Sequence, residues 1–187
     1  PLRRQRQMCI RDSFKCDYQF NAPFTAWDEV SSTVSYRDAP KDKPFFYVWN
    51  TLLTHESRIW ERSNQPLTVN PEDIIIPSYF PDIPEVRNDI ARKYSNIEAM
   101  DKKVGELISQ LEEDGLLENT IIMFWSDHGG NLLRQKRAVG NSGLNVPLII
   151  RYPDKMDAGK VDERIVSLMD LGPTVLSLLN IEPPKHY

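Results

Sequence analysis

The chain has 187 residues, of which 40% are hydrophobic and 27% charged, so it has the length and composition of a globular domain with a sizeable core. Its formal net charge of −4 argues against a nucleic-acid-binding protein, because neutralising phosphates requires clustered lysine and arginine. No apolar run approaches the roughly 20 residues of a transmembrane helix. The two cysteines, Cys9 and Cys16, form neither a metal-binding motif nor a disulfide framework.

Residues 1–13 differ in character from the rest of the chain. They are basic and rich in glutamine, and they have no apolar periodicity. The segment is similar to the peptide obtained when sequencing-adapter sequence is translated at the end of an assembled contig. We therefore predict that residues 1–13 are non-native and that residues 14–187 are the genuine chain, the alternative being a natural basic arm.

Four apolar segments predict buried strands, and two amphipathic segments predict helices. The strands are expected at 44–50, 120–125, 145–152 and 165–169. A long helix is expected to begin at Pro84 and to end before Gly115, because apolar residues recur there in steps of three and four. A shorter helix is expected at 170–179. Because strands alternate with helices, the predicted fold class is α/β with a largely parallel sheet and flanking helices.

Residues 61–84 contain five prolines and many polar residues, and they predict a long surface loop. Loops of this length in a compact domain are usually functional. We expect this loop to form the rim of a substrate cleft.

Polar side chains follow two of the predicted strands. Asp127 and His128 come directly after the strand at 120–125, His55 follows the strand at 44–50, and Lys136 lies eight residues beyond His128. In parallel α/β sheets, ligands bind at the carboxyl ends of the strands. Asp127 and His128 could ligate a divalent cation, while His55 and Lys136 could hold an oxyanion. Each residue also has a structural alternative, such as a capping Asp, a core His or a solvated charge run.

Several motifs in this chain resemble, in the same order, those of the type I sulfatases of the alkaline phosphatase-like superfamily. The resemblance is closest to heparan N-sulfatase (sulfamidase-like) members and extends over most of residues 14–187. The triplet Asp127-His128-Gly129 alone is not specific, because alkaline phosphatase relatives share it. The motifs that carry the resemblance are at 45–50, 54–57, 76–87, 100–105, 125–129, 142–149 and 169–175.

The resemblance implies roles for four of these residues. Asp127 and His128 match the pair that binds the divalent metal, usually one Ca²⁺ ion. Lys136 matches the basic residue that contacts the sulfate and the leaving oxygen. His55 matches the histidine that hydrogen-bonds the sulfate and can protonate the leaving group.

The family's Lys-x-His motif has a weaker counterpart at Lys15-Cys16-Asp17. Lys15 matches the lysine that contacts the nucleophile and the sulfate, and Asp17 stands in place of the histidine as a substrate-binding residue. Because Asp17 replaces this histidine, the resemblance implies the roles of Lys15 and Asp17 less strongly than those of the other residues.

The chain departs from the family pattern at the nucleophile. Sulfatases act through a formylglycine made from the cysteine of a Cys-x-Pro-x-Arg motif, and neither Cys9 nor Cys16 has that context. The early Asp-Asp metal pair is also absent. We expect both to lie upstream, so that this chain is a fragment of a sulfatase catalytic domain truncated at both ends and inactive alone.

The resemblance implies a metal-dependent sulfatase that cleaves sulfate esters or N-sulfates on a carbohydrate, as in glycosaminoglycan degradation. Relatives are usually periplasmic, secreted or lysosomal. Two alternatives remain open. One is a zinc-dependent phosphatase or phosphodiesterase of the same superfamily with a Ser or Thr nucleophile, because His128 suits zinc. The other is a non-catalytic sulfatase-like module that binds glycans.

Overall fold

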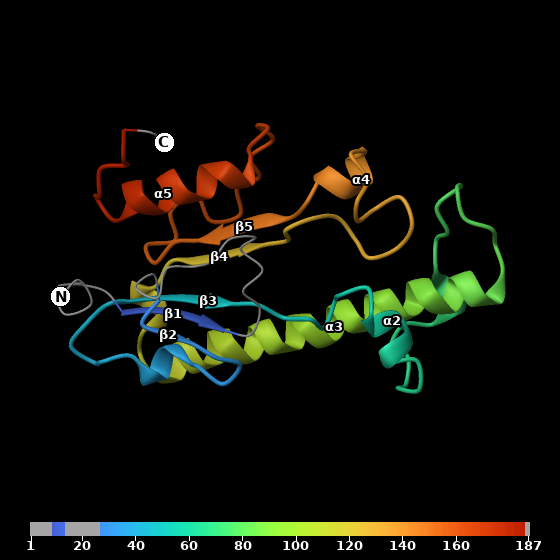
Figure 1. Cartoon of the computed structure of the whole chain (residues 1–187), viewed down its shortest axis with the longest axis horizontal. Coiled ribbons are helices and arrows are strands. Elements are labelled where there is room, and N and C mark those ends of the chain that lie inside the picture. The colour runs from blue at the N-terminus through green and yellow to red at the C-terminus, as the bar shows by residue number, and fades with distance from the viewer. Residues whose placement is uncertain (1–8, 14–26, 186–187) are drawn as a thin grey trace. The chain divides into compact units, whose positions relative to one another are not determined.

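The computed structural model describes residues 9–13 and 27–185 of the chain (Figure 1). It consists of two compact units, Pro1–Gly105 and Glu106–Tyr187, which are described in turn. Lys15 and Asp17, two of the predicted site residues, lie outside the described residues.

Unit 1 contains a parallel sheet of three strands. The strands are β1 (Cys9–Ser13), β2 (Glu29–Val30) and β3 (Phe45–Trp49), in the order β2-β1-β3. β1 pairs with β3 in register from Cys9 opposite Phe45 to Ser13 opposite Trp49. β3 confirms the strand predicted at 44–50, and the parallel pairing agrees with the predicted fold class.

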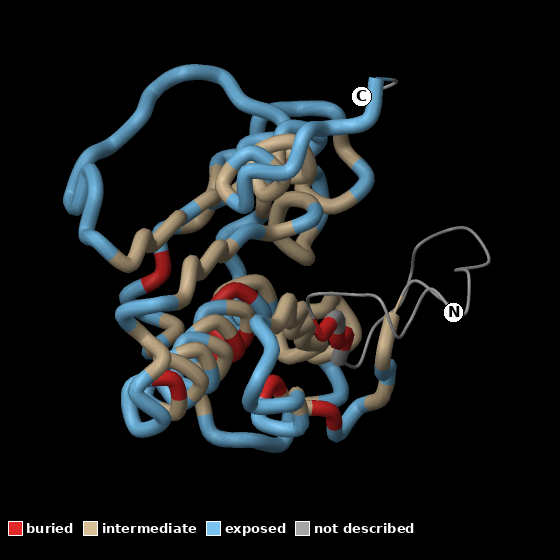
Figure 2. Tube along the Cα trace, turned by 90° about the vertical axis from the view of Figure 1, so that its left-hand side faces the viewer, coloured by how far each residue is buried: buried red, intermediate tan, exposed pale blue. Residues whose placement is uncertain are grey.

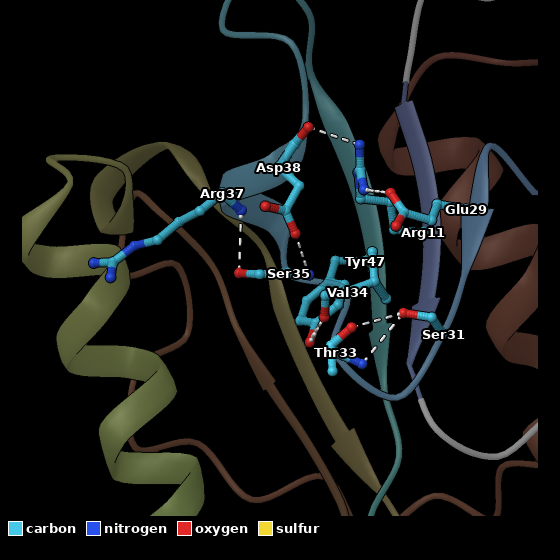
Figure 3. Close-up of polar contacts among 9 residues, drawn as sticks. All are labelled: Arg11, Glu29, Ser31, Thr33, Val34, Ser35, Arg37, Asp38 and Tyr47. Carbon is cyan, nitrogen blue, oxygen red and sulfur yellow. Dashed lines mark hydrogen bonds and ion pairs between the residues drawn. The ribbon is translucent and has the colours of Figure 1, made fainter.

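The middle strand of this sheet, β1, lies within the segment predicted to be non-native. A middle strand of a parallel sheet is normally a run of apolar residues, whereas β1 buries Arg11 and Asp12. Arg11 pairs with Glu29 and donates a hydrogen bond to the Asp38 carbonyl at 2.7 Å (Figure 3), but its buried Nε has no hydrogen-bond partner among the residues that the structure describes. Such a buried, unsatisfied donor is costly. The foreign origin of residues 1–13 stays a prediction.

A small aromatic cluster covers the sheet of unit 1. The 3-10 turn η1 (Tyr36–Asp38) buries Tyr36, whose ring stacks on Phe45 at a centroid distance of 5.2 Å. The hydroxyl of Tyr47 donates to the Val34 carbonyl at 3.2 Å (Figure 3). The aromatic residues that predicted a buried strand therefore pack against the segment 34–36.

The long helix α3 (Pro84–Glu113) confirms the helix predicted to begin at Pro84. It ends in a Schellman motif, in which the N–H of Leu116 donates to the Leu111 carbonyl at 2.8 Å and that of Gly115 to Glu112 at 3.0 Å. Gly115 has φ 68°, a left-handed conformation that glycine adopts without steric cost. The predicted stop signal is confirmed.

The buried face of α3 is more polar than its apolar pattern predicts. Ile90 is buried as expected, but Tyr94 is 44% exposed. The helix instead buries a patch of small and polar residues (Figure 2), which are Ala91, Arg92, Ser95 and Asn96. Three of these side chains hydrogen-bond to segments that precede the helix in the chain.

The proline-rich loop 61–84 is held against α3 by these polar side chains. Arg92 donates to carbonyls of Ser63, Gln65 and Pro66, and the Ser95 hydroxyl accepts from the N–H groups of Thr68 and Val69. Farther along, Arg87 donates to three carbonyls around η2 (Pro71–Asp73) and forms two hydrogen bonds with Asp82. The loop is thus fixed by hydrogen bonds in unit 1, while its role as a cleft rim stays a prediction.

Unit 2 contains an antiparallel strand pair. β4 (Ile122–Trp125) and β5 (Leu148–Arg151) pair from Ile122 opposite Arg151 to Trp125 opposite Leu148. Both confirm predicted strands, but their pairing is antiparallel. Among the described residues this pair is a sheet of its own, separate from the parallel sheet of unit 1. The 3-10 turn η3 (Leu117–Asn119) precedes β4, and Arg151 donates to the Leu117 carbonyl at 2.9 Å.

The strand predicted at 165–169 is wrong. Residues 165–167 are irregular, and the 3-10 turn η4 (Leu168–Asp170) follows, leading into α5 (Leu171–Leu178). A capping box explains the difference, since the Ser167 hydroxyl accepts from the Met169 N–H and the Asp170 carboxylate accepts from the Ser167 N–H. These local bonds turn the backbone where the apolar composition favours an extended strand. α5 confirms the helix predicted at 170–179.

Within residues 9–13 and 27–185, no helix combines the length and the apolar character needed to cross a membrane.

Candidate active site

The loop that follows β4 carries the two predicted metal ligands. β4 ends at Trp125, and the chain then turns through Ser126, Asp127 and His128. The Ser126 hydroxyl donates to the His128 carbonyl at 2.7 Å, which closes a tight local turn. This turn sets Asp127, whose side chain is 69% exposed, beside the half-buried His128.

The ring of His128 is held in one tautomer. Its Nδ1 lies 2.7 Å from the Gly129 carbonyl oxygen, which can only accept, so Nδ1 carries the proton. In the neutral ring Nε2 then has a lone pair, and this nitrogen lies 3.8 Å from Oδ2 of Asp127. Histidines that ligate metals commonly donate their other ring N–H to a carbonyl in this way.

Asp127 and His128 fit the role of two ligands to one divalent cation. A carboxylate oxygen and an imidazole nitrogen at this separation can both reach one ion. In the part of the chain that the structure describes, no group of three or more His, Cys, Asp or Glu side chains is arranged to hold a metal. The pair is thus half of a candidate site, and closing it requires further ligands.

Two glycines bring the loop after β4 into close contact with the segment before β5. The N–H of Gly129 donates to the Gly143 carbonyl at 2.8 Å. A Cβ atom at Gly129 would lie 1.9 Å from the Ser142 carbonyl oxygen, and one at Gly143 would lie 2.0 Å from that of Ala138. Only glycine fits at either position without a backbone shift. The short helix α4 (Asn141–Leu144) thereby supports the Asp127–His128 turn.

Lys136 lies on the same loop of unit 2. Its N–H donates to the Gly130 carbonyl at 2.8 Å, which ties the lysine backbone to the residues that follow the metal pair. The neighbouring Arg134 and Arg137 have φ values of 62° and 68°, so the chain turns sharply on both sides of Lys136. Left-handed arginines are uncommon and mark this loop as a candidate functional segment.

His55 lies in unit 1, in the turn between β3 and α2 (Arg58–Glu61). Its N–H donates to the Leu52 carbonyl at 3.0 Å, and its own carbonyl accepts from the Arg58 N–H at 2.9 Å. Its ring Nδ1 lies 3.3 Å from the Ser57 backbone nitrogen and 3.2 Å from the Ser57 hydroxyl. Lys136 belongs to unit 2, and the prediction that His55 shares a site with it stays a prediction.

Asn96 of α3 holds the turn that carries His55 through hydrogen bonds. It was not predicted to be a site residue from the sequence. Asn96 is fully buried. Its Oδ1 accepts from Arg62 Nε at 2.9 Å, and its Nδ2 donates to the Arg58 carbonyl at 3.3 Å. A polar residue on the buried side of an apolar stripe is a signal that could have identified it.

The sequence of this chain matches a known protein family and individual known proteins. A family model described as Sulfatase matches residues 18–181. The chain is 38% identical to an ulvan-active sulfatase of Formosa agariphila over 100% of this chain and 37% of that protein. It is 32% identical to human N-sulphoglucosamine sulphohydrolase, over 65% of this chain and 24% of that protein.

A solved structure agrees with the sequence relatives. YidJ of Bacteroides fragilis, described as a sulfatase, superposes with a TM-score of 0.58 at 27% identity, over 78% of this chain and 34% of that chain. The chain thus spans between 24% and 37% of the length of these three relatives.

Proposed function

This chain belongs to the sulfatase family, and we propose that it forms part of an enzyme that hydrolyses sulfate esters or N-sulfates on a glycan with the help of one Ca²⁺ ion. The observation that carries the proposal is the Asp127–His128 turn. The Nε2 lone pair of His128 lies 3.8 Å from the Asp127 carboxylate, and the opposite ring nitrogen is held by a carbonyl.

The proposed roles follow from the charge and hydrogen-bonding capacity of each side chain. Asp127 and His128 would hold the metal, which when bound supplies positive charge to the sulfate oxygens. The Lys136 ammonium would donate to the sulfate and to the leaving oxygen, and His55 would donate to a sulfate oxygen. Fixed cationic donors of this kind stabilise the charge that develops in the transition state.

The nucleophile is proposed to lie outside this chain. Formylglycine is made from the cysteine of a Cys-x-Pro-x-Arg motif, and neither Cys9 nor Cys16 stands in one. Lys15 and Asp17 are proposed to contact the substrate near that nucleophile. We therefore expect the 187-residue chain alone to release no sulfate from a sulfate ester.

Two substrate classes are supported by relatives. The relative that aligns with the whole chain is named for activity on ulvan, and the human relative is named for N-sulphoglucosamine. We propose a sulfated polysaccharide of the ulvan type as the first choice, because that alignment covers more of this chain at higher identity. N-sulfated glucosamine is the second choice.

A zinc-dependent phosphatase or phosphodiesterase is the second candidate function. It is favoured by one observation, the imidazole ligand His128, because zinc accepts nitrogen ligands readily whereas calcium prefers oxygen. A third candidate is a module that binds glycans without cleaving them.

Metal analysis and a substrate panel with the full-length protein that contains this chain separate these candidates. We expect about one calcium per chain and sulfate release from ulvan oligosaccharides or N-sulfoglucosamine, with no release of phosphate from phosphate esters. Two zinc ions with phosphate release would support the phosphatase. Glycan binding without any release would support the binding module.

A further inference from the structure

We propose that Trp60 is a stacking platform for a sugar ring of the substrate, namely the ring next to the one that carries the reacting sulfate. The position and the surroundings of Trp60 follow from the geometry of unit 1. The identity of the ligand as a sulfated glycan rests on the proposed function. On this assignment Trp60 makes the protein prefer a longer glycan to a single sulfated sugar.

The indole of Trp60 is open to solvent. Trp60 is 62% exposed, more than any other aromatic residue in the described part of the chain. Among those residues its indole makes no hydrogen bond and no ring contact. Tryptophan has one of the largest apolar side chains and is highly buried on average. An indole left open on a hydrogen-bonded turn is therefore a candidate contact surface for a ligand.

The backbone that carries Trp60 is held from the side opposite the indole. α2 lies beside α3 (Figure 1), where Asn96 accepts from Arg62 Nε and donates to the Arg58 carbonyl. Ile59 is buried. Successive residues of a helix are about 100° apart around its axis, so Trp60 lies on the side of the turn away from these contacts. The platform is thus fixed at its base and free at its face.

Ser57 connects this platform to His55. The Arg58 N–H donates to the His55 carbonyl and the Glu61 N–H to the Ser57 carbonyl, so residues 55–61 form a continuous helical turn. Residues three apart in such a turn are neighbours, with Cβ atoms about 5–6 Å apart, which places Ser57 beside Trp60. The Ser57 hydroxyl also lies 3.2 Å from Nδ1 of His55. The indole and the imidazole therefore border the same serine, and two adjoining sugar rings can contact both.

The polar surroundings of Trp60 favour a sugar over a protein partner. Within residues 51–74, Trp60 is the only large hydrophobic residue that is exposed. Protein interfaces usually bury a contiguous apolar patch instead. A sugar ring offers a face of C–H groups to the electron-rich face of an aromatic ring, while the hydroxyls at its edge require polar partners. Polar neighbours three and four positions from Trp60 meet that requirement, and they are Glu56, Ser57, Ser63 and Asn64.

The first test compares substrates of different length with the full-length protein. Trp60→Ala should raise KM for a sulfated oligosaccharide by roughly 2- to 12-fold with kcat unchanged, because a contact made equally before and during reaction changes KM alone. Both constants should stay unchanged for the sulfated monosaccharide. Tyr94→Ala, at another exposed aromatic residue of unit 1, is the matched control and should alter neither substrate. Equal effects of Trp60→Ala on both substrates, or none on either, would overturn the proposal.

The second test observes Trp60 directly and does not depend on turnover. A sugar ring stacked on an indole changes the fluorescence of that indole. Two desulfated probes, an ulvan oligosaccharide and a glucosamine oligosaccharide, are titrated into the full-length protein. At least one should change the tryptophan emission of the wild type, and the conservative variant Trp60→Phe should abolish the change. Trp125→Phe, which removes another exposed tryptophan, should keep it.

Two results of the titration would contradict the platform. One is an emission change that persists in Trp60→Phe. The other is no change with either probe in the wild type, as expected if another part of the full-length protein covers Trp60. This test decides the proposal even where Trp60→Ala does not fold.

The two tests also separate the platform from the proposed function. A wild-type protein that releases no sulfate but shows binding that depends on Trp60 would refute the sulfatase and support the platform. Sulfate release with no dependence of the Trp60→Ala effect on glycan length would support the sulfatase and refute the platform.

Discussion

At the scale of single residues, the position of the candidate metal pair depends on the close approach of two backbone segments, the loop after β4 and the segment before β5. Asp127 and His128 are presented by a turn that Gly129 ties to Gly143. The pair itself was predictable, because an acid and an imidazole follow a buried strand and precede glycines. The need for glycine at position 143 was not, since it arises from the Ala138 carbonyl, which no local pattern reveals.

Gly143→Ala should destabilise the chain and weaken metal binding. The new Cβ would lie 2.0 Å from the Ala138 carbonyl oxygen, and crowding of this kind costs about 1–3 kcal/mol. Urea unfolding of the chain measures the first effect, and calcium titration of the full-length protein measures the second. Gly140→Ala is the matched control, because a Cβ there meets nothing within 4 Å. Equal stabilities of the two variants would contradict the proposed contact.

Asp82 should titrate below the ordinary range of a carboxyl group. Hydrogen bonds from Arg87 lower its pKa. A lowered folded-state pKa gives stability that is fully present above the ordinary pKa of about 3.9 and is lost as the pH falls through the folded value. In NMR titrations, Arg87→Gln should return the Asp82 pKa toward its ordinary value. Lys102→Gln, at an exposed position of the same helix, should leave it unchanged. Identical titration curves in both variants would refute this cause.

At the scale of elements, the sequence predicted both long helices and three of the strands, where a single pattern acted alone, but it predicted neither β1 nor β2. α3 has an apolar repeat, a proline at its first turn and a glycine after its last, and it forms as predicted. The strand at 165–169 failed because Ser167 and Asp170 form a capping box that outweighs apolar composition. The hydrogen bonds that Arg92, Ser95 and Asn96 of α3 form with earlier segments were not predicted, because their partners lie 26 to 38 residues away in the sequence.

Asn96→Ala should loosen the turn that carries His55. The substitution leaves the Arg58 carbonyl and the Arg62 side chain without their partner, which costs about 1–3 kcal/mol. Urea unfolding gives the stability, and hydrogen exchange of residues 55–62 gives the local effect. The control is Glu98→Ala, an exposed position on the same helix. Unchanged exchange in the Asn96 variant would show that α2 is held by other contacts.

At the scale of the whole molecule, unit 2 has several large apolar side chains that are exposed. Ile149, Ile165 and Met169 are 62%, 102% and 83% exposed. Exposed apolar patches and unpaired strand edges promote association. We expect the chain to self-associate at high concentration in light scattering, and Ile165→Ser with Met169→Gln to reduce it. A monodisperse wild-type monomer at those concentrations would contradict this expectation.

The central claim is that Asp127 and His128 hold the metal of a sulfatase. Its most direct test is the rate of sulfate release by the full-length protein, with calcium and after chelation, for the wild type and for Asp127→Ala. Glu163→Gln, at an exposed position of the same unit, is the control.

We predict that chelation and Asp127→Ala each lower the rate by on the order of 100-fold or more, since a metal contributes several kcal/mol to transition-state stabilisation. Calcium should restore the chelated wild type but not the variant. Wild-type rates in the Asp127→Ala protein would contradict the account.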